Sequence, residues 1–155
     1  MPPHRVINLW ETFSDVDAVR RIAELRASAR STTNAAGCHV YLGSRNGDGY
    51  GQWTIYPTGA PPGRASQRAV LVHRLAYRAA NPNAVFDEAL HMSHICHNRA
   101  CFNADHIVME TREKNISRIG CPGDVLCLCG CAEISFECPH GDADENFKCF
   151  PLWWR

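Results

Sequence analysis

The sequence predicts a small mixed α+β domain, and three observations carry this prediction. Apolar residues recur at helical spacing over residues 14–30, whereas residues 38–56 show the alternation of strands around a turn. Eight of the nine cysteines lie after residue 95, mixed with histidines. At 155 residues the chain is about one domain long, so we expect a single domain over residues 1–155.

The first expected element is an amphipathic helix over about residues 14–30. Ser14 has the side chain of an N-cap, and apolar residues then recur at intervals of three and four on one face. Such a helix normally covers a sheet or contacts a partner. The segment STTNAAG, residues 31–37, reads as a turn, so residues 1–37 are expected to form an N-terminal helix region.

Residues 38–80 are predicted to form a small antiparallel sheet and a helix. Two strands flank the turn at 46–49, a third is expected within 64–70, and a helix follows over 70–80. Although the net charge of the chain is zero, residues 39–81 carry a local charge of +4. A ribbon bearing Arg and Gln can read bases in the major groove of DNA. The same pattern also fits a sheet with a solvated polar face.

A first group of metal ligands lies within residues 93–123. Cys96, Cys101 and His106 follow one another at intervals of five, beside turn-forming residues. Thiolates and imidazoles of this kind bind zinc tetrahedrally, so one more ligand is required. Cys38 is the obvious candidate, because no other cysteine precedes this segment. The alternative for Cys38 is a small core side chain.

A second group of metal ligands lies within residues 121–155. The expected ligands are Cys121, Cys138, His140 and Cys149. Three further cysteines compete with them for a place, namely Cys127, Cys129 and Cys131. Four protein ligands leave no open coordination position, so both zincs are expected to be structural. They would hold together a region with few large apolar residues.

One imidazole and one carboxamide in the same segment are not needed by zinc. His94 lies two residues before Cys96, and Asn115 lies in a short helix expected to begin at Thr111, after a strand at 106–110. A neutral imidazole can take a proton from water, and an amide oxygen is a hard ligand suited to Mg²⁺. Such a pair can hydrolyse a phosphodiester. Alternatively, His94 supports the zinc site and Asn115 serves only the helix surface.

The segment 93–123 resembles the His-Cys box of the homing endonucleases, which belong to the ββα-metal, or His-Me finger, nucleases. The resemblance rests on Ser93-His94-Ile95-Cys96-His97-Asn98, Cys101, His106, Asn115 and Cys121-Pro122-Gly123. It is looser outside these residues. It implies a ββα-metal motif, with His94 as the general base and Asn115 as the single Mg²⁺ ligand. It also implies two structural Zn²⁺ ions, held by the two groups of ligands described above.

Enzymes of this family are homodimers that cut both strands of near-palindromic DNA and leave 5′-phosphate and 3′-hydroxyl ends. The resemblance therefore implies a site-specific, Mg²⁺-dependent endodeoxyribonuclease of the intron-homing type, located in the nucleus. Its antiparallel DNA-binding sheet would span residues 39–69. The expected DNA contacts are Arg45, Gln52, Arg64, Gln67, Arg68 and Arg74. The family's phosphate-clamping arginine has no unambiguous counterpart here, and Arg64 is our choice for it among the catalytic residues.

Two other functions fit the same residues. One is a zinc-stabilised DNA-binding protein without nuclease activity, which needs the zinc ligands but neither His94 nor Asn115. The other is a nonspecific or RNA-directed nuclease that shares the ββα-metal site. The sequence has no apolar run typical of a membrane span or a secretory signal, and reduced thiols favour the cytoplasm or nucleus. Trp153 and Trp154 are expected to be buried against a partner subunit or against the same subunit.

Overall fold

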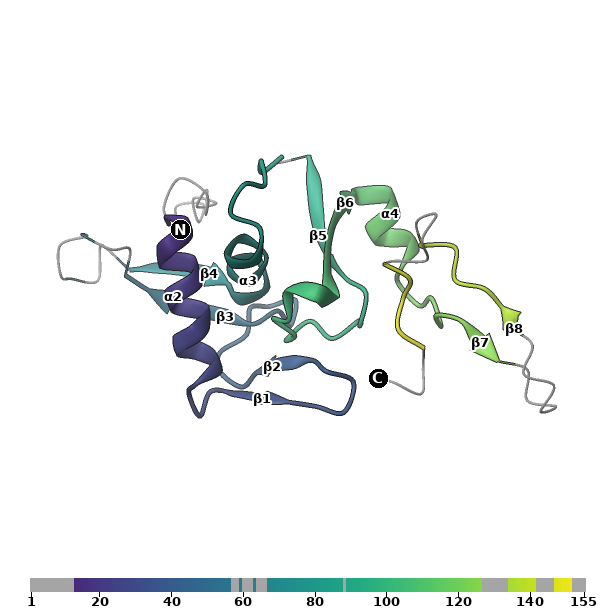
Figure 1. The fold of residues 1–155 in the computed structure, drawn as a ribbon, viewed down its shortest axis with the longest axis horizontal. Coiled ribbons are helices and arrows are strands. Elements are labelled where there is room, and N and C mark those ends of the chain that lie inside the picture. Colours follow the sequence, from purple (N-terminus) through teal and green to yellow (C-terminus); the bar gives the residue numbers. More distant parts are fainter. Residues whose placement is uncertain are drawn as a thin grey trace.

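A computed structural model describes residues 13–56, 59, 63, 67–87, 89–126, 134–141 and 147–151. It confirms the predicted mixed α+β fold (Figure 1). In chain order the elements are α2 (Asp15–Arg26), β1 (Ser31–Thr33), β2 (His39–Tyr41), β3 (Gln52–Ile55), β4 (Arg68–Leu71), α3 (Val72–Ala80), β5 (Leu90–His94), η2 (Ala104–His106), β6 (Ile107–Thr111), α4 (Arg112–Ser117), β7 (Val125–Leu126) and β8 (Ile134–Phe136). Within the described ranges, no helix is long and apolar enough to cross a membrane.

The N-terminal helix α2 begins as predicted and ends earlier. The Ser14 Oγ accepts a hydrogen bond from the Asp17 backbone N–H at 3.1 Å, as an N-cap should. The hydroxyls of Ser28 and Ser31 both donate to the Leu25 carbonyl, at 2.8 and 3.0 Å. These bonds compete with continued helix and turn the chain into β1. Part of the segment expected to be a turn is therefore a strand.

The predicted pairing of the two strands around the Asn46 turn is wrong. The turn itself forms and is closed by an isolated antiparallel bridge between Arg45 and Gly51, the residues on its two sides. However, β2 pairs with β1, and β3 pairs with β4. The edge of β2 that does not pair with β1 contacts the loop after β5, where the Tyr41 N–H donates to the Ala100 carbonyl at 2.9 Å. The expected single sheet over residues 39–69 is likewise wrong, because the described strands pair only in twos.

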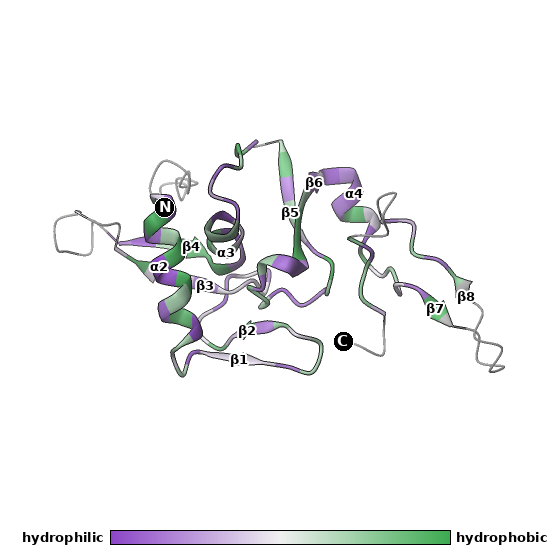
Figure 2. Ribbon diagram, viewed as in Figure 1, coloured by the Kyte–Doolittle hydropathy of each residue, from purple (hydrophilic) through white to green (hydrophobic). Residues whose placement is uncertain are grey.

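The apolar core lies between α2, α3 and the β3–β4 sheet. Four of its largest fully buried side chains are Phe13, Leu25, Leu75 and Phe102. Figure 2 shows hydrophobic segments in this half of the molecule and a largely hydrophilic α4. Phe102 comes from the loop between β5 and β6, so it joins that hairpin to the core.

The elements β5, β6 and α4 form a ββα unit. The two strands pair antiparallel, with Leu90 opposite Thr111 and His94 opposite Ile107. Thr111 ends β6 and caps α4, since its hydroxyl accepts from the Lys114 N–H at 3.3 Å. In Figure 1 the hairpin stands between α3 and α4. This order of two strands and a helix is the one that the resemblance implied.

Candidate metal centres and active site

Four buried side chains form the first metal centre, which we define as Cys38, Cys96, Cys101 and His106. Their ligand atoms all lie within 4.8 Å of one another. The His106 Nδ1 is 3.5 Å from the Cys38 Sγ and 3.6 Å from the Cys101 Sγ. Zinc bonds of about 2.3 Å to sulfur and about 2.0 Å to nitrogen give tetrahedral sulfur–nitrogen edges of about 3.5 Å. The centre therefore has the dimensions of a zinc site.

The loop that carries Cys96 and Cys101 is shaped by the turn-forming residues that the sequence places there. His97 has a left-handed backbone with φ of 56°. The Asn98 side-chain oxygen accepts from the Ala100 N–H at 3.0 Å, and the Asn98 carbonyl accepts from the Cys101 N–H at 2.9 Å. These bonds fold the chain back on itself, so that both thiols point to the same centre.

The thiols of the first metal centre need a cation to be ionised together. Hydrogen bonding from Cys101 lowers the pKa of Cys96 to about 4. Burial raises the pKa of Cys38 to about 11, and the neighbouring Cys96 thiolate raises the pKa of Cys101 above its ordinary value. One negative charge is thus stable in this pocket and further ones are not, which is the condition that Zn²⁺ relieves.

The second metal centre consists of Cys121, Cys138, His140 and Cys149, all of them buried. The Cys121 and Cys138 sulfurs are 3.7 Å apart, and the His140 Nδ1 is 3.4 Å from the Cys138 Sγ and 3.5 Å from the Cys149 Sγ. The sulfurs are much too far apart for a disulfide, whose bond length is about 2.05 Å. They match the edges of a zinc tetrahedron. The competing Cys127, Cys129 and Cys131 lie outside the described residues.

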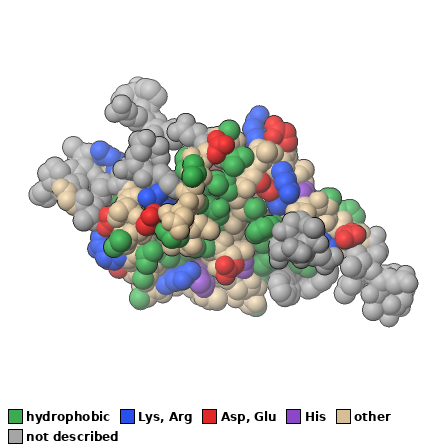
Figure 3. Space-filling model, turned by 45° about the horizontal axis from the view of Figure 1, so that its top comes forward, with side chains coloured by type: hydrophobic (Ala, Val, Ile, Leu, Met, Phe, Trp, Pro, Cys, Tyr) green, Lys and Arg blue, Asp and Glu red, His purple; other side chains and the backbone are tan. Residues whose placement is uncertain are grey.

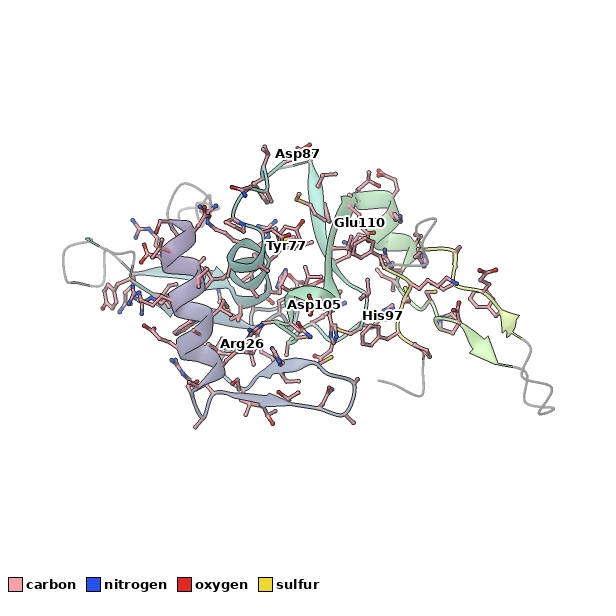
Figure 4. The ribbon with its side chains drawn as sticks, in the orientation of Figure 1. Arg26, Tyr77, Asp87, His97, Asp105 and Glu110 are labelled. Carbon is pink, nitrogen blue, oxygen red and sulfur yellow. The ribbon has the colours of Figure 1, made fainter. Side chains whose placement is uncertain are left out.

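The second metal centre is tied to the ββα unit by α4 and the residue that follows it. The His140 Nε2 is 2.9 Å from the Ser117 hydroxyl. The Arg118 guanidinium donates to the Cys149 Sγ at 3.5 Å and makes two bonds to the Glu110 carboxylate, at 2.7 and 2.8 Å. Glu110 lies on β6, facing α4 (Figure 4). A buried ion pair therefore links the hairpin to the second metal centre.

Burial and ion pairing act in opposite directions on Glu110. Burial raises the pKa of its carboxyl, but hydrogen bonds from Arg118 and Ser93, together with the positive charges of Arg118 and Lys114, outweigh this effect and hold the pKa below its ordinary value. Reciprocally, the carboxylate keeps the pKa of the Arg118 guanidinium above its ordinary value in spite of burial. The pair is thus fully charged and almost entirely excluded from water, since both side chains are at most 5% exposed.

His94 lies at the end of β5, beside the first metal centre. Its Nε2 is 2.9 Å from the Cys101 carbonyl oxygen. The imidazole is 8% exposed and lies against two rings, with centroids 4.7 Å from His73 and 5.8 Å from Tyr50. Burial lowers the pKa of His94. The ring is therefore neutral near pH 7 and held on three sides.

Sequence reasoning missed His73 and Tyr50 as neighbours of His94. His73 lies in the first turn of α3 and is 4% exposed, and burial lowers its pKa well below the ordinary value. Its position on the apolar face of a helix pattern was a usable signal for burial. The contact with His94 depends on how α3 packs against β5, which no local pattern encodes.

Asn115 is partly buried on α4. Its Nδ2 lies 3.2 Å from the Nδ1 of His91, a β5 residue that sequence reasoning also missed. Among the described residues no hydrogen bond joins Asn115 to His94. The two are connected through β5, on which His91 precedes His94 by three residues, or about 10 Å. The structure thus places both residues on the same ββα unit, with His94 at the end of β5 and Asn115 on α4, beside His91 near the start of β5.

The expected DNA contacts are dispersed. Arg45 is exposed, the Gln67 amide donates to the Tyr56 hydroxyl at 2.6 Å, and Arg68 donates to the Gln67 carbonyl. Arg74 lies on α3, within the helix predicted over residues 70–80, and not on a strand. Gln52 is half-buried on β3. Arg64 lies outside the described residues.

Charged side chains of both signs mix on the visible surface. On the face in Figure 3, the described Lys and Arg side chains lie apart from one another and often beside acidic ones. Arg99, which sequence reasoning did not single out, is closer to the candidate active site. It donates to the Asp48 carbonyl at 2.6 Å and covers the Tyr50 ring at 5.5 Å, and Tyr50 in turn stacks on His94.

Comparison with known proteins adds one finding to this geometry. The family model described as the zinc-binding loop region of homing endonuclease matches residues 37–155, a range that includes both metal centres and the whole ββα unit. No curated protein and no solved structure matches the chain. The family implies a nuclease-like protein that binds DNA. With most of its length matched and both zinc-type centres in place, the chain belongs to the homing endonuclease zinc-binding loop family.

Proposed function

We propose that the protein is a Mg²⁺-dependent, site-specific endonuclease that cuts both strands of DNA. The observation that carries this proposal is the 2.9 Å contact between the His94 Nε2 and the Cys101 carbonyl. Because a carbonyl can only accept, Nε2 carries the hydrogen and Nδ1 keeps its lone pair. An imidazole fixed in one tautomer is prepared to act as a base.

In this proposal His94 deprotonates the water that attacks the scissile phosphate. The stacked Tyr50 ring and the tilted His73 ring restrict the imidazole, so that its orientation is set before substrate binds. Attack on phosphorus from the side opposite the 3′ oxygen releases a 3′-hydroxyl and leaves the phosphate on the 5′ end. His94 needs only to accept a proton, which agrees with its neutral state.

The surroundings of Asn115 fit a hard cation. The amide nitrogen is within hydrogen-bonding distance of His91, so the carboxamide oxygen is available as a ligand. Magnesium held there, and by oxygens of the phosphate, would neutralise charge on the phosphate and on the leaving oxygen. Asn115 and His94 need not touch, because a phosphate group, a water molecule and the cation lie between them in such a complex.

The two metal centres support this site and do not take part in the reaction. Each offers four protein ligands with the spacing of a zinc tetrahedron, so no position is left for substrate. The first metal centre fixes the Cys101 carbonyl that orients His94. The second metal centre is attached to α4, which carries Asn115.

The remaining features of the proposal concern assembly and location. Cutting both strands of one site requires two active sites, and a two-fold homodimer on near-palindromic DNA supplies them. We assign DNA contacts to the polar side chains of Arg45, Gln52, Arg64, Gln67, Arg68 and Arg74, with Arg64 also clamping the scissile phosphate. We also propose a nuclear location and a role in intron homing, by analogy with the family.

The decisive experiment is cleavage of a random duplex library by the zinc-loaded protein with Mg²⁺. We expect one preferred sequence, cut on both strands. His94→Ala should lower the cleavage rate by about 10²–10⁴-fold and leave DNA affinity nearly unchanged, because a base is lost and no phosphate contact is removed. His97→Asn is the matched control, since it removes a neighbouring imidazole and Asn tolerates the left-handed backbone there.

Three results would contradict the proposal in different ways. If the His94→Ala variant still cleaves DNA, the assignment of His94 as the general base is wrong. Equal cutting of all duplexes would indicate a nonspecific nuclease. DNA binding without any cleavage would leave a zinc-stabilised DNA-binding protein.

A further inference from the structure

A second imidazole on β5 contacts the proposed magnesium ligand. His91 lies outside the segment that carries the family resemblance, which begins at Ser93, and it has no part in either metal centre. It is half-buried, and its Nδ1 lies 3.2 Å from the Asn115 Nδ2. No other side-chain hydrogen bond of Asn115 is found among the described residues.

A carboxamide needs such a partner if it is to serve as a metal ligand. Its two ends are similar in size, but only the oxygen can bind a hard cation, whereas the nitrogen carries two hydrogens. A half-turn about the Cβ–Cγ bond of Asn115 would therefore replace a ligand with a repelling donor. A fixed acceptor beside the nitrogen prevents that rotation.

We infer that His91 is a positioning residue, which accepts a hydrogen bond from the Asn115 amide and so keeps the carboxamide oxygen turned toward the cation. The inference rests on the proposed function, because it gives Asn115 the role of metal ligand. His91 then carries its own hydrogen on Nε2 and presents the Nδ1 lone pair to the amide.

The fold makes this contact a rigid one. His91 is opposite Glu110 in the β5–β6 ladder, and α4 begins only two residues after Glu110. The Thr111 cap fixes the first turn of α4, and the Glu110–Arg118 ion pair fixes its far end. The two partners in the contact are therefore held by one hairpin and by both ends of a short helix.

The alternative is that His91 is itself a ligand. An imidazole nitrogen binds transition metals well and Mg²⁺ poorly, so direct ligation would change the metal preference of the site. Orientation and ligation are separable by experiment, because only ligation brings the imidazole nitrogen into contact with the metal.

We propose to test the inference with Mn²⁺ as the probe, added to the full-length, zinc-loaded protein bound to its preferred DNA duplex, because phosphate oxygens complete the proposed site. Mn²⁺ affinity is measured from the electron paramagnetic resonance signal of the free ion, and nitrogen contact from electron spin echo modulation. We expect His91→Leu to weaken Mn²⁺ binding by about 10-fold or more, as outer-sphere substitutions typically do. His91→Gln should restore most of the affinity, because its side-chain oxygen can accept the same bond. No imidazole modulation should appear in the unaltered protein.

Each contrary result has a distinct meaning. If Asn115→Ala weakens Mn²⁺ binding and His91→Leu does not, the positioning role is wrong while the proposed metal site survives. If imidazole modulation is present and disappears in His91→Leu, His91 is a ligand and the inference is overturned. If Asn115→Ala changes nothing, the proposed ligand is wrong and the inference fails with it. Zinc content and far-ultraviolet circular dichroism, measured for every variant, identify any that does not fold.

Discussion

The two halves of this protein are held together by different physical means. The N-terminal half, from α2 to α3, buries large apolar side chains such as Phe13, Leu25 and Leu75 between these two helices and the β3–β4 sheet. In the C-terminal half, the described cluster around the second metal centre consists of cysteines alone, and α4 contains no buried residue. Liganded metal can therefore take the place of an apolar core where the chain has too few apolar residues to form one.

The largest effect should come from removing metal from the second half. Structural zinc contributes about 10 kcal/mol or more to the folding of small zinc modules. We expect Cys138→Ser to abolish amide hydrogen-exchange protection in α4 and the chain beyond it, while α2 and α3 stay protected. Val125→Ser, a change at a residue that is not a ligand in the same region, is the control. Equal loss of protection in α2 would show that the two halves do not differ as described.

Disrupting the buried Glu110–Arg118 ion pair, which links the hairpin to the second metal centre, should have the next largest effect on stability. Removing one partner of a buried pair costs about 3–5 kcal/mol, because the other charge is left without compensation. We therefore expect Arg118→Met to lower the free energy of unfolding by about that amount in urea titrations. The double variant Arg118→Met with Glu110→Leu should recover part of the loss. If the double variant is no more stable than the single one, the charge is not the cause.

A cavity in the apolar half should have a comparable or slightly smaller effect. Leu75→Ala removes a fully buried side chain and should cost about 2–5 kcal/mol in the same titration. The distinctive expectation is that zinc content stays at two ions per chain. Val85→Ala, at a residue that is 84% exposed, should change stability by less than about 0.5 kcal/mol. Loss of zinc from Leu75→Ala would show that the two halves depend on each other for folding.

Removing the N-cap at the start of α2 should have the smallest effect on stability. Ser14→Ala removes the N-cap and should cost about 1 kcal/mol, whereas Ser14→Asn keeps a capping oxygen and should be close to neutral. Thermal unfolding followed by circular dichroism measures the difference. The two variants should bind zinc equally, since the cap is remote from both metal centres.

Local signals predicted the parts of the fold that depend on nearby residues. The Ser14 cap, the strand at β6 and the helix opening at Thr111 were all predicted from short patterns. The failure of β2 to pair with β3 was not predictable, because the edge of β2 away from β1 is hydrogen-bonded to the loop that holds Cys101, far away in sequence. Strand pairing is decided by tertiary contacts that a turn motif does not contain.

The candidate site divides in the same way. The spacing and chemical type of the residues were enough to identify both sets of metal ligands as candidates, together with His94 and Asn115. The neighbours His73 and His91 were not predicted, because each acts through a contact between elements that are separate in sequence. An imidazole on a helix face or a strand gives no local indication of what it will meet.

Cys101 serves two centres with different atoms. Its sulfur belongs to the first metal centre, while its backbone oxygen meets the ring of His94. Oxidation of that thiol would release the loop and, with it, the partner that selects the tautomer of His94. Under the proposed function, this one residue would thus couple the folding of the metal-binding loop to the orientation of the general base.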